Sequence, residues 1–120
     1  MSETLLVIED NEQNLYLMQY LLEKSGFTVM GARNGRDGIQ MALTQKPGAV
    51  LLDIQLPEMD GCAVAVELRL HEEMKGIPII AVTSYAMVGD RQRILASGIN
   101  GYIEKPIDPE TFVEEIRRYF

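Results

Sequence analysis

Short apolar runs alternate with segments of helical periodicity along this 120-residue chain, and this alternation constrains the fold more than any other feature. The runs are short, carry β-branched residues and are bounded by Gly, Pro or charged residues, which is typical of strands. Most are apolar without alternation, and such strands are usually buried on both faces of a parallel sheet. We expect strands at 5–8, 27–30, 49–52, 77–82 and 101–103.

The segments between these runs have apolar residues at helical spacing and carry helix-end signals. Asn11, Asn34 and Asp108 are expected N-caps, and Gly26 and Gly98 are expected to end helices. Five strands, each followed by a helix, predict a three-layer α/β fold in which one domain (residues 1–120) has a doubly wound, five-stranded parallel sheet. The expected helices span 12–24, 35–45, 61–73, 87–96 and 109–119.

The charge and the cysteine content exclude several classes of protein. The net charge is −7 and the pI is about 4.6, so the chain lacks the basic footprint that direct nucleic-acid binding needs. Its single cysteine, Cys62, cannot form an internal disulfide or build a Cys-rich metal site. No apolar run approaches the ~18 residues of a membrane span, and the acidic start is unlike a secretory signal. We therefore expect a cytoplasmic protein that does not act in a membrane.

Polar residues follow almost every expected strand at its carboxyl end. Glu9 and Asp10 follow the first strand, Asp53 the third, Thr83 the fourth, and Lys105 lies just past the fifth. In an open α/β sheet, ligands bind outside the carboxyl ends of the strands. These side chains are far apart in the sequence, but they are expected to converge on one crevice.

Three carboxylates with a hydroxyl and an ammonium suit phosphoryl chemistry assisted by a hard cation. Closely packed carboxylates repel one another, and a bound cation relieves that repulsion. Oxygen ligands without His or Cys favour Mg²⁺, which also accepts phosphate oxygens as ligands. A carboxylate beside such an ion can attack phosphorus and form an aspartyl phosphate, while the cation and Lys105 offset the charge of the phosphoryl oxygens.

The polar residues at the strand ends are highly specific when taken together and in order. Across essentially its whole length, the chain resembles the receiver domain of two-component response regulators, in particular single-domain members similar to the chemotaxis regulator. The resemblance rests on the Glu9-Asp10 pair, on residues 51–61 (LLDIQLPEMDG), on Thr83 and on Lys105-Pro106. It implies a flavodoxin-like fold with strand order 2-1-3-4-5.

The resemblance implies a role for each residue of the crevice. Asp53 would accept a phosphoryl group from a partner histidine. Asp53 and Asp10, with Glu9 through water and the main-chain carbonyl of Gln55, would hold Mg²⁺, for which Mn²⁺ can substitute. The chain would then be a phosphoprotein of a two-component or phosphorelay pathway. It would not be an enzyme, since it would promote only its own phosphorylation and slow autodephosphorylation.

The resemblance also implies a conformational switch. Thr83 and Lys105 would bind the phosphoryl oxygens, and the Thr83 hydroxyl would move inward so that the ring of Tyr102 follows it. The peptide bond between Lys105 and Pro106 is commonly cis in this family, which would aim the lysine at the crevice. The output face would be formed by helix four, strand five and helix five, and is expected to include Arg91, Tyr102, Glu114 and Arg118.

Some residues near the crevice depart from the commonest family pattern. The acidic pair is Glu-Asp where Asp-Asp is more usual, and Ser84 stands where the family usually has Ala. Tyr85 is bulky enough to cover part of the site, and Gln55 lies near the acceptor. We predict that Gln55 and Tyr85 tune the rate of dephosphorylation. Asp60, which precedes helix three, is expected to cap that helix rather than to bind metal.

The partners follow from the expected chemistry. A histidine kinase or a histidine phosphotransfer protein would donate the phosphoryl group, and a downstream protein would read the output face. The sequence is compatible with a stand-alone regulator and with a receiver taken from a longer protein. Two other functions stay open: a degenerate receiver that acts as a constitutive interaction module, and a small aspartyl-phosphate phosphatase of the haloacid dehalogenase type. The phosphatase motif needs a second Asp where this chain has Gln55.

Overall fold

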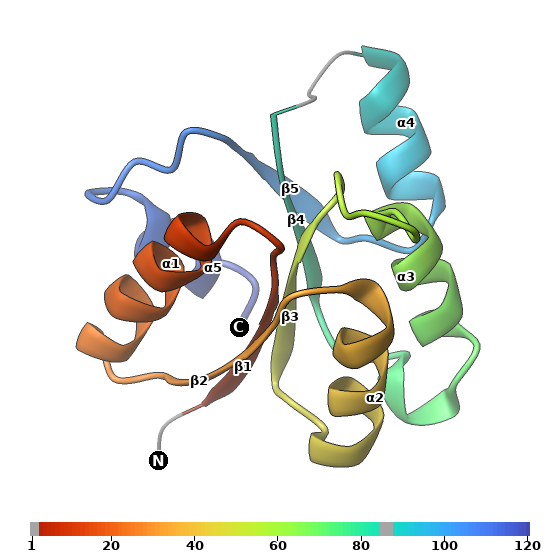
Figure 1. Cartoon of the computed structure of the whole chain (residues 1–120), viewed down its shortest axis with the longest axis horizontal. Helices are drawn as coiled ribbons and strands as arrows, with labels where there is room; N and C mark the ends of the chain where they lie inside the picture. The colour runs from red at the N-terminus through yellow and green to blue at the C-terminus, as the bar shows by residue number, and fades with distance from the viewer. Residues whose placement is uncertain (1–2, 85–87) are drawn as a thin grey trace.

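A five-stranded parallel sheet forms the central layer of the computed structural model, which describes residues 3–84 and 88–120 (Figure 1). The strand order is β2-β1-β3-β4-β5, which confirms the predicted flavodoxin-like arrangement. Each pair of neighbouring strands is parallel. The strands are β1 (Thr4–Ile8), β2 (Thr28–Ala32), β3 (Ala49–Asp53), β4 (Ile79–Thr83) and β5 (Gly101–Glu104).

Helices cover both faces of the sheet, with α1 and α5 on one side and α2, α3 and α4 on the other (Figure 1). Within the described residues, no helix has the length and apolar character needed to cross a membrane. The helices are α1 (Glu12–Lys24), α2 (Gly35–Gln45), α3 (Gly61–Arg69), α4 (Val88–Ala96) and α5 (Phe112–Arg117), with a short 3₁₀ helix, η1 (Glu72–Met74).

The core consists of two apolar layers, one on each face of the sheet. Side chains alternate along a strand, so Leu5 and Val7 of β1 pack toward α1 and α5, whereas Leu6 and Ile8 pack toward the opposite helices. β3 and β4 are buried along their whole length, as the non-alternating apolar runs predicted. The sheet is therefore a rigid base, and its carboxyl edge can hold polar side chains in fixed positions.

Three helix starts are capped by the side chains that the sequence indicated. Asn11, Asn34 and Asp60 each accept a hydrogen bond from the main-chain N–H three residues ahead, at 2.9, 2.8 and 2.9 Å. Each cap satisfies a donor at a helix start that has no partner within the helix. The expected helix-capping role of Asp60 is thus confirmed.

The predicted start of the last helix was wrong. α5 begins at Phe112 with Thr111 as its N-cap, and not at Pro109 with Asp108 as the cap. The Asp108 carboxylate instead accepts a hydrogen bond from the main-chain N–H of Glu110, at 2.9 Å. Its carbonyl oxygen accepts hydrogen bonds from Thr111 and Phe112. A separate turn therefore precedes the regular helix.

The third helix and the fourth strand also differ from their predicted bounds. α3 ends at Arg69, and η1 and a turn follow it. The Arg69 guanidinium donates hydrogen bonds to the carbonyls of Met74 and Ile77 and so holds this following segment in place. β4 begins at Ile79, two residues later than predicted, because Pro78 has no N–H to donate to the sheet.

Candidate functional site

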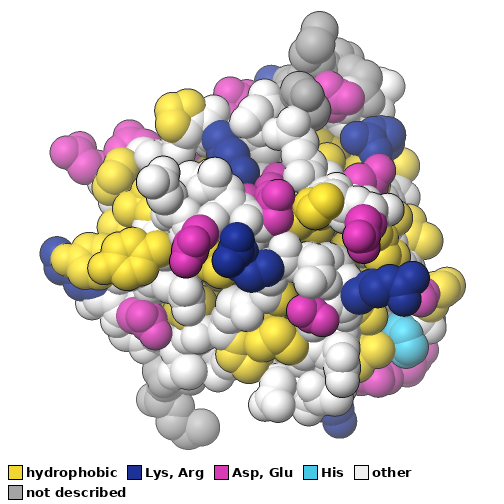
Figure 2. Space-filling view, in the orientation of Figure 1, with side chains coloured by type: hydrophobic (Ala, Val, Ile, Leu, Met, Phe, Trp, Pro, Cys, Tyr) yellow, Lys and Arg dark blue, Asp and Glu magenta, His cyan; other side chains and the backbone are white. Residues whose placement is uncertain are grey.

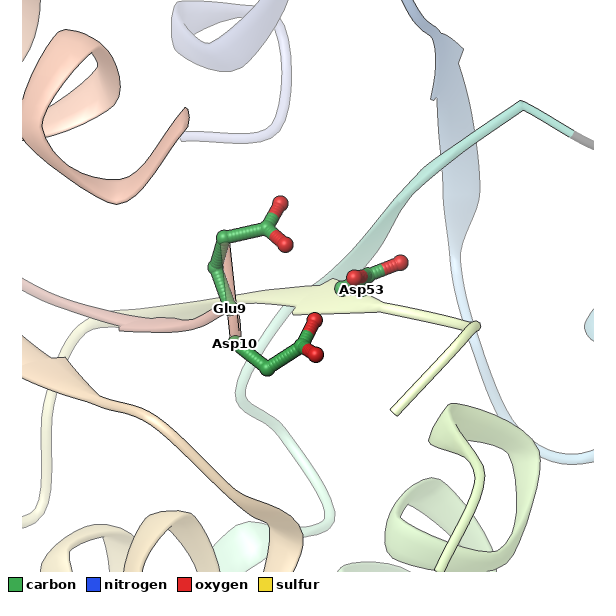
Figure 3. A group of neighbouring side chains, drawn as sticks. All are labelled: Glu9, Asp10 and Asp53. Atoms are coloured by element: carbon green, nitrogen blue, oxygen red, sulfur yellow. The ribbon is translucent and has the colours of Figure 1, made fainter. Parts of the chain in front are cut away.

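Three carboxylates meet at the carboxyl edge of the sheet. Glu9 and Asp10 come directly after β1, and Asp53 is the last residue of the neighbouring strand β3. One oxygen from each carboxylate lies within 4.8 Å of the others (Figure 3). The strand order reverses at β1, since β2 and β3 pair with its two sides, and ligands bind at such a reversal in α/β sheets. The convergence expected from the sequence is therefore present.

Asp53 is held in one orientation from two sides. Its side chain is only 3% exposed. Its Oδ1 accepts a hydrogen bond from the main-chain N–H of Gln55 at 3.0 Å, and its Oδ2 lies 3.5 Å from the Lys105 Nζ. A buried carboxylate with fixed oxygens has a defined direction of approach toward a reacting atom.

Lys105 brings a positive charge into the same crevice from β5. Its main-chain N–H donates to the carbonyl of Thr83 at 2.9 Å, which ties the residue to the end of β4. Its Nζ lies 2.8 Å from Oε1 of Glu9, and its side chain is 13% exposed. The peptide bond between Lys105 and Pro106 is cis, as the family resemblance implied.

Glu9 is the most unusual group of the site because its side chain is fully buried. Its Oε2 accepts a hydrogen bond from the main-chain N–H of Asn11 at 3.2 Å. Its Oε1 accepts no well-formed hydrogen bond from the described residues, so the close contact with Lys105 is an ion pair of poor hydrogen-bond geometry. Burial, assisted by the contact with Asp53 and opposed by Lys105, raises the pKa of Glu9 to about 7.

These residues fit a hard divalent cation. The donor set consists of carboxylate oxygens only, and one of its buried oxygens lacks a satisfactory hydrogen bond. Both features suit Mg²⁺, which takes oxygen ligands and is commonly bound by one or two carboxylates together with water and phosphate oxygens. A cation would also offset the mutual repulsion of the three acidic groups.

The raised pKa of Glu9 predicts how the stability of the metal-free protein depends on pH. Between the ordinary carboxyl pKa of 4.5 and about 7, the folded protein keeps a proton that the unfolded chain has released. The stability that this proton gives to the folded state is fully present below pH 4.5 and is lost as the pH rises through about 7. With EDTA present, we expect the urea concentration at the unfolding midpoint of the wild-type protein to decrease as the pH is raised from about 5 to about 8. The decrease is measured relative to the midpoint of Glu9→Gln over the same pH range. Parallel pH profiles for the two proteins would contradict the prediction.

The other sequence-predicted residues lie around this cluster. Thr83 is fully buried at the end of β4. Gln55 is exposed and contributes its main-chain N–H to Asp53. Tyr102 of β5 is partly buried, pairs in register with Ala81 and packs against the core layer on the α2–α4 side. Tyr85, the other residue predicted to tune dephosphorylation, lies outside the described residues.

Arg33 is a contact of the site that the sequence analysis missed. It follows β2 directly, and its guanidinium donates two hydrogen bonds to the main-chain carbonyl of Asp10, from Nε at 3.1 Å and from Nη2 at 3.0 Å. The second strand was predicted to end at residue 30, whereas β2 runs to Ala32, so Arg33 was not recognised as a residue that directly follows a strand.

The fold agrees with comparisons to known proteins. A family model described as the response regulator receiver domain matches residues 5–117. The chain belongs to this family. The polar-differentiation response regulator DivK of Brucella anthropi is 41% identical to this receiver domain over 119 residues, which cover 99% of this chain and 97% of DivK.

Solved structures support the same assignment. The receiver domain of the sensor histidine kinase PA1611 from Pseudomonas aeruginosa PAO1 is 31% identical, with a TM-score of 0.91 and 99% and 98% of the two chains covered. That structure has a magnesium ion coordinated in its active site cleft. The chemotaxis protein CheY4 of Vibrio cholerae superposes over the full length of both chains with a TM-score of 0.96 at 23% identity, which shows the shared fold. The acidic cluster of this receiver domain is compatible with Mg²⁺ binding.

Proposed function

We propose that this receiver domain accepts a phosphoryl group on Asp53 from a phosphohistidine of a partner protein, with Mg²⁺ as cofactor. The observation that carries the proposal is the joint placement of three carboxylates and one ammonium at the end of β1, β3 and β5. Glu9, Asp10 and Asp53 would hold the cation, with the main-chain carbonyl of Gln55 as a further ligand. Lys105 already contacts Asp53 and would pair with an oxygen of the incoming group.

The proposed transfer of the phosphoryl group needs no reactant other than the phosphohistidine donor. An oxygen of the Asp53 carboxylate forms a bond to phosphorus as the bond from phosphorus to the donor imidazole nitrogen breaks, and the imidazole leaves with the electron pair. Mg²⁺ would supply positive charge to the phosphoryl oxygens. Lys105 would add a second positive charge, and the Thr83 hydroxyl would donate a hydrogen bond to one phosphoryl oxygen. Water later hydrolyses the acyl phosphate, so the chain acts on itself and on no separate substrate.

Contacts between α4 and β5 support an output role for the face that α4, β5 and α5 form. The Arg91 guanidinium lies over the Tyr102 ring at 5.3 Å from its centroid and also pairs with the Glu104 carboxylate at 3.7 Å. A movement of Tyr102 toward Thr83 would therefore change how Arg91 is held. Phosphorylation would alter the surface of α4, β5 and α5, where Glu114 and Arg118 are exposed.

The expected partners are proteins. DivK is a response regulator and the PA1611 receiver is part of a sensor histidine kinase, which supports a histidine kinase or a histidine phosphotransfer protein as phosphodonor. A downstream protein would bind the output face.

On the face in Figure 2, basic side chains stand apart and acidic ones lie between them, so the described surface there offers no continuous basic patch for nucleic acid. The buried free thiol of Cys62 suits a reducing cytoplasm.

The decisive test uses the whole chain with Mg²⁺ and acetyl phosphate, followed by intact-mass measurement and by release of inorganic phosphate. We expect one labile adduct with the mass of a single phosphoryl group, and none when EDTA is present. Repeated turnover of a small phosphate ester, offered in place of acetyl phosphate, would instead indicate a phosphatase. A folded protein that forms no adduct under these conditions would indicate a degenerate receiver and would contradict the proposal.

The side chain of Gln55 is expected to affect how long the phosphoryl group persists. It is exposed two residues after the acceptor, where its amide can orient an attacking water, as a glutamine does in some phosphate-hydrolysing enzymes. We expect Gln55→Ala to slow autodephosphorylation several-fold, measured by loss of the adduct mass with time. Gln45→Ala, at an exposed position that ends α2, is the matched control. Equal decay rates for Gln55→Ala and the wild type would show that this side chain has no such role.

A further inference from the structure

The loop between β1 and α1 carries two of the three carboxylates, and Arg33 holds it from outside the loop. Beyond the last register pair of β1 and β2, the Glu9 N–H still donates to the carbonyl of Ala32 at 2.9 Å. The two chains then diverge toward α1 and α2. Just past that point, the Arg33 side chain links the two segments, because it donates both of its hydrogen bonds to the carbonyl oxygen of Asp10.

Apart from the hydrogen bonds to the Asp10 carbonyl, the loop is held by contacts of Asn11. Asn11 caps α1, and its main-chain N–H donates to Glu9. Both contacts fix the loop from the side of α1 and the core. Among the contacts shown by the described residues, only the two hydrogen bonds from Arg33 link the Asp10 carbonyl to the segment that follows β2. Loss of these two bonds would let this part of the loop shift, and a shift of the Asp10 Cα would carry the Asp10 carboxylate with it.

We propose that Arg33 is a positioning residue that sets the direction of the Asp10 carboxylate toward the bound cation. This inference rests on the proposed function, since it concerns the same Mg²⁺ site. Arg33 touches neither the cation nor the phosphoryl group in this role, and acts through the Asp10 main chain. A planar guanidinium can place two donors on one oxygen in fixed geometry, whereas a lysine ammonium is a point charge on a flexible stem.

The charge of Arg33 acts in the opposite direction from its proposed role. A positive charge near the acidic cluster repels a divalent cation, so its removal would strengthen Mg²⁺ binding if Coulomb interactions alone decided the affinity. Loss of an orienting partner of a metal ligand weakens metal binding instead, commonly by about 10- to 100-fold. The sign of the change therefore separates the two effects.

The experiment compares the wild-type chain with Arg33→Gln and Arg33→Lys by titration with MgCl₂ at constant ionic strength and pH. The main-chain amide signals of Asn11 and Gln55 in nitrogen–proton correlation spectra report binding, and urea unfolding shows that each variant is folded. We expect both variants to bind Mg²⁺ about tenfold more weakly than the wild type, at the lower end of the range because Arg33 is exposed. The matched control is Arg36→Gln, which removes the same charge from an exposed residue in the first turn of α2.

The outcomes are distinct. Weaker binding by both Arg33 variants, with Arg36→Gln unchanged or slightly tighter, supports the positioning role. Tighter binding by Arg33→Gln with no change in Arg33→Lys would show that only charge matters and would overturn it, as would unchanged affinity in either Arg33 variant. Absence of any saturable Mg²⁺ response in the wild-type chain would instead overturn the proposed function, and the positioning role with it.

Discussion

Asp53→Asn is expected to abolish phosphoryl incorporation from acetyl phosphate completely. The amide keeps the size of the side chain and can still accept the hydrogen bond from the Gln55 N–H at its oxygen. It is not a nucleophile toward phosphorus, and it removes one charged ligand from the proposed Mg²⁺ site. Intact mass after incubation with Mg²⁺ and acetyl phosphate measures the loss directly.

Asp60→Asn is the matched control for this substitution. Asp60 is an exposed carboxylate on the same segment, where it caps α3 and pairs with Arg93 at 3.7 Å. Asn is also a good N-cap, so the fold should be preserved. We expect Asp60→Asn to form the adduct to the same extent as the wild type. A full adduct on Asp53→Asn, or its loss in the control, would mean that the acceptor has been assigned to the wrong residue.

Gly61→Ala is expected to destabilise the protein by about 1–3 kcal/mol, as overpacking against rigid neighbours typically does. A Cβ at this position would lie 2.5 Å from the carbonyl oxygen of Asp53 and 2.7 Å from the Cα of Ile54. Both atoms belong to the backbone at the end of β3, so they cannot move aside as a flexible side chain would. The Gly61 N–H also donates to the Ile54 carbonyl at 2.9 Å, which holds α3 against this strand. The urea midpoint measures the loss of stability.

The same substitution should also impair the site. The backbone that would have to move carries Asp53, the proposed phosphoacceptor, so we expect the folded fraction of Gly61→Ala to form the adduct more slowly. Gly76→Ala is the control, because a Cβ there meets no atom within 4 Å. Its stability should stay within about 0.5 kcal/mol of the wild type, as for surface substitutions in general. A wild-type urea midpoint for Gly61→Ala would show that the end of β3 relaxes more easily than the close contacts indicate.

The sequence predicted best those features that depend on a few neighbouring residues. Asn11 and Asn34 were correctly predicted as helix caps because an N-cap bond spans only three residues. Asp108 was incorrectly predicted by the same rule. Its side chain bonds within an earlier turn, and cap signals do not distinguish a turn from the first turn of a helix.

Contacts between distant segments were beyond such local rules. Arg33 contacts Asp10 across 23 positions in the sequence, and this contact exists only because β1 and β2 pair in parallel with Ile8 opposite Ala32. The segment that follows α3 is likewise held by what Arg69 reaches, and its guanidinium also bonds the Gly98 carbonyl. No periodicity or cap signal contains this information.

The sequence by itself determined the order of strands and helices, the family, and the residue types at the strand ends, because short-range sterics and the burial of apolar runs control these features. Only the tertiary structure decided how those residues act together. It placed three carboxylate oxygens within 4.8 Å of one another and buried Glu9 completely beside Lys105. Packing of the whole sheet controls how close these carboxylates lie and how far they are buried from water. Both factors change the proton affinity of a carboxylate, and neither can be read from its neighbours in the sequence.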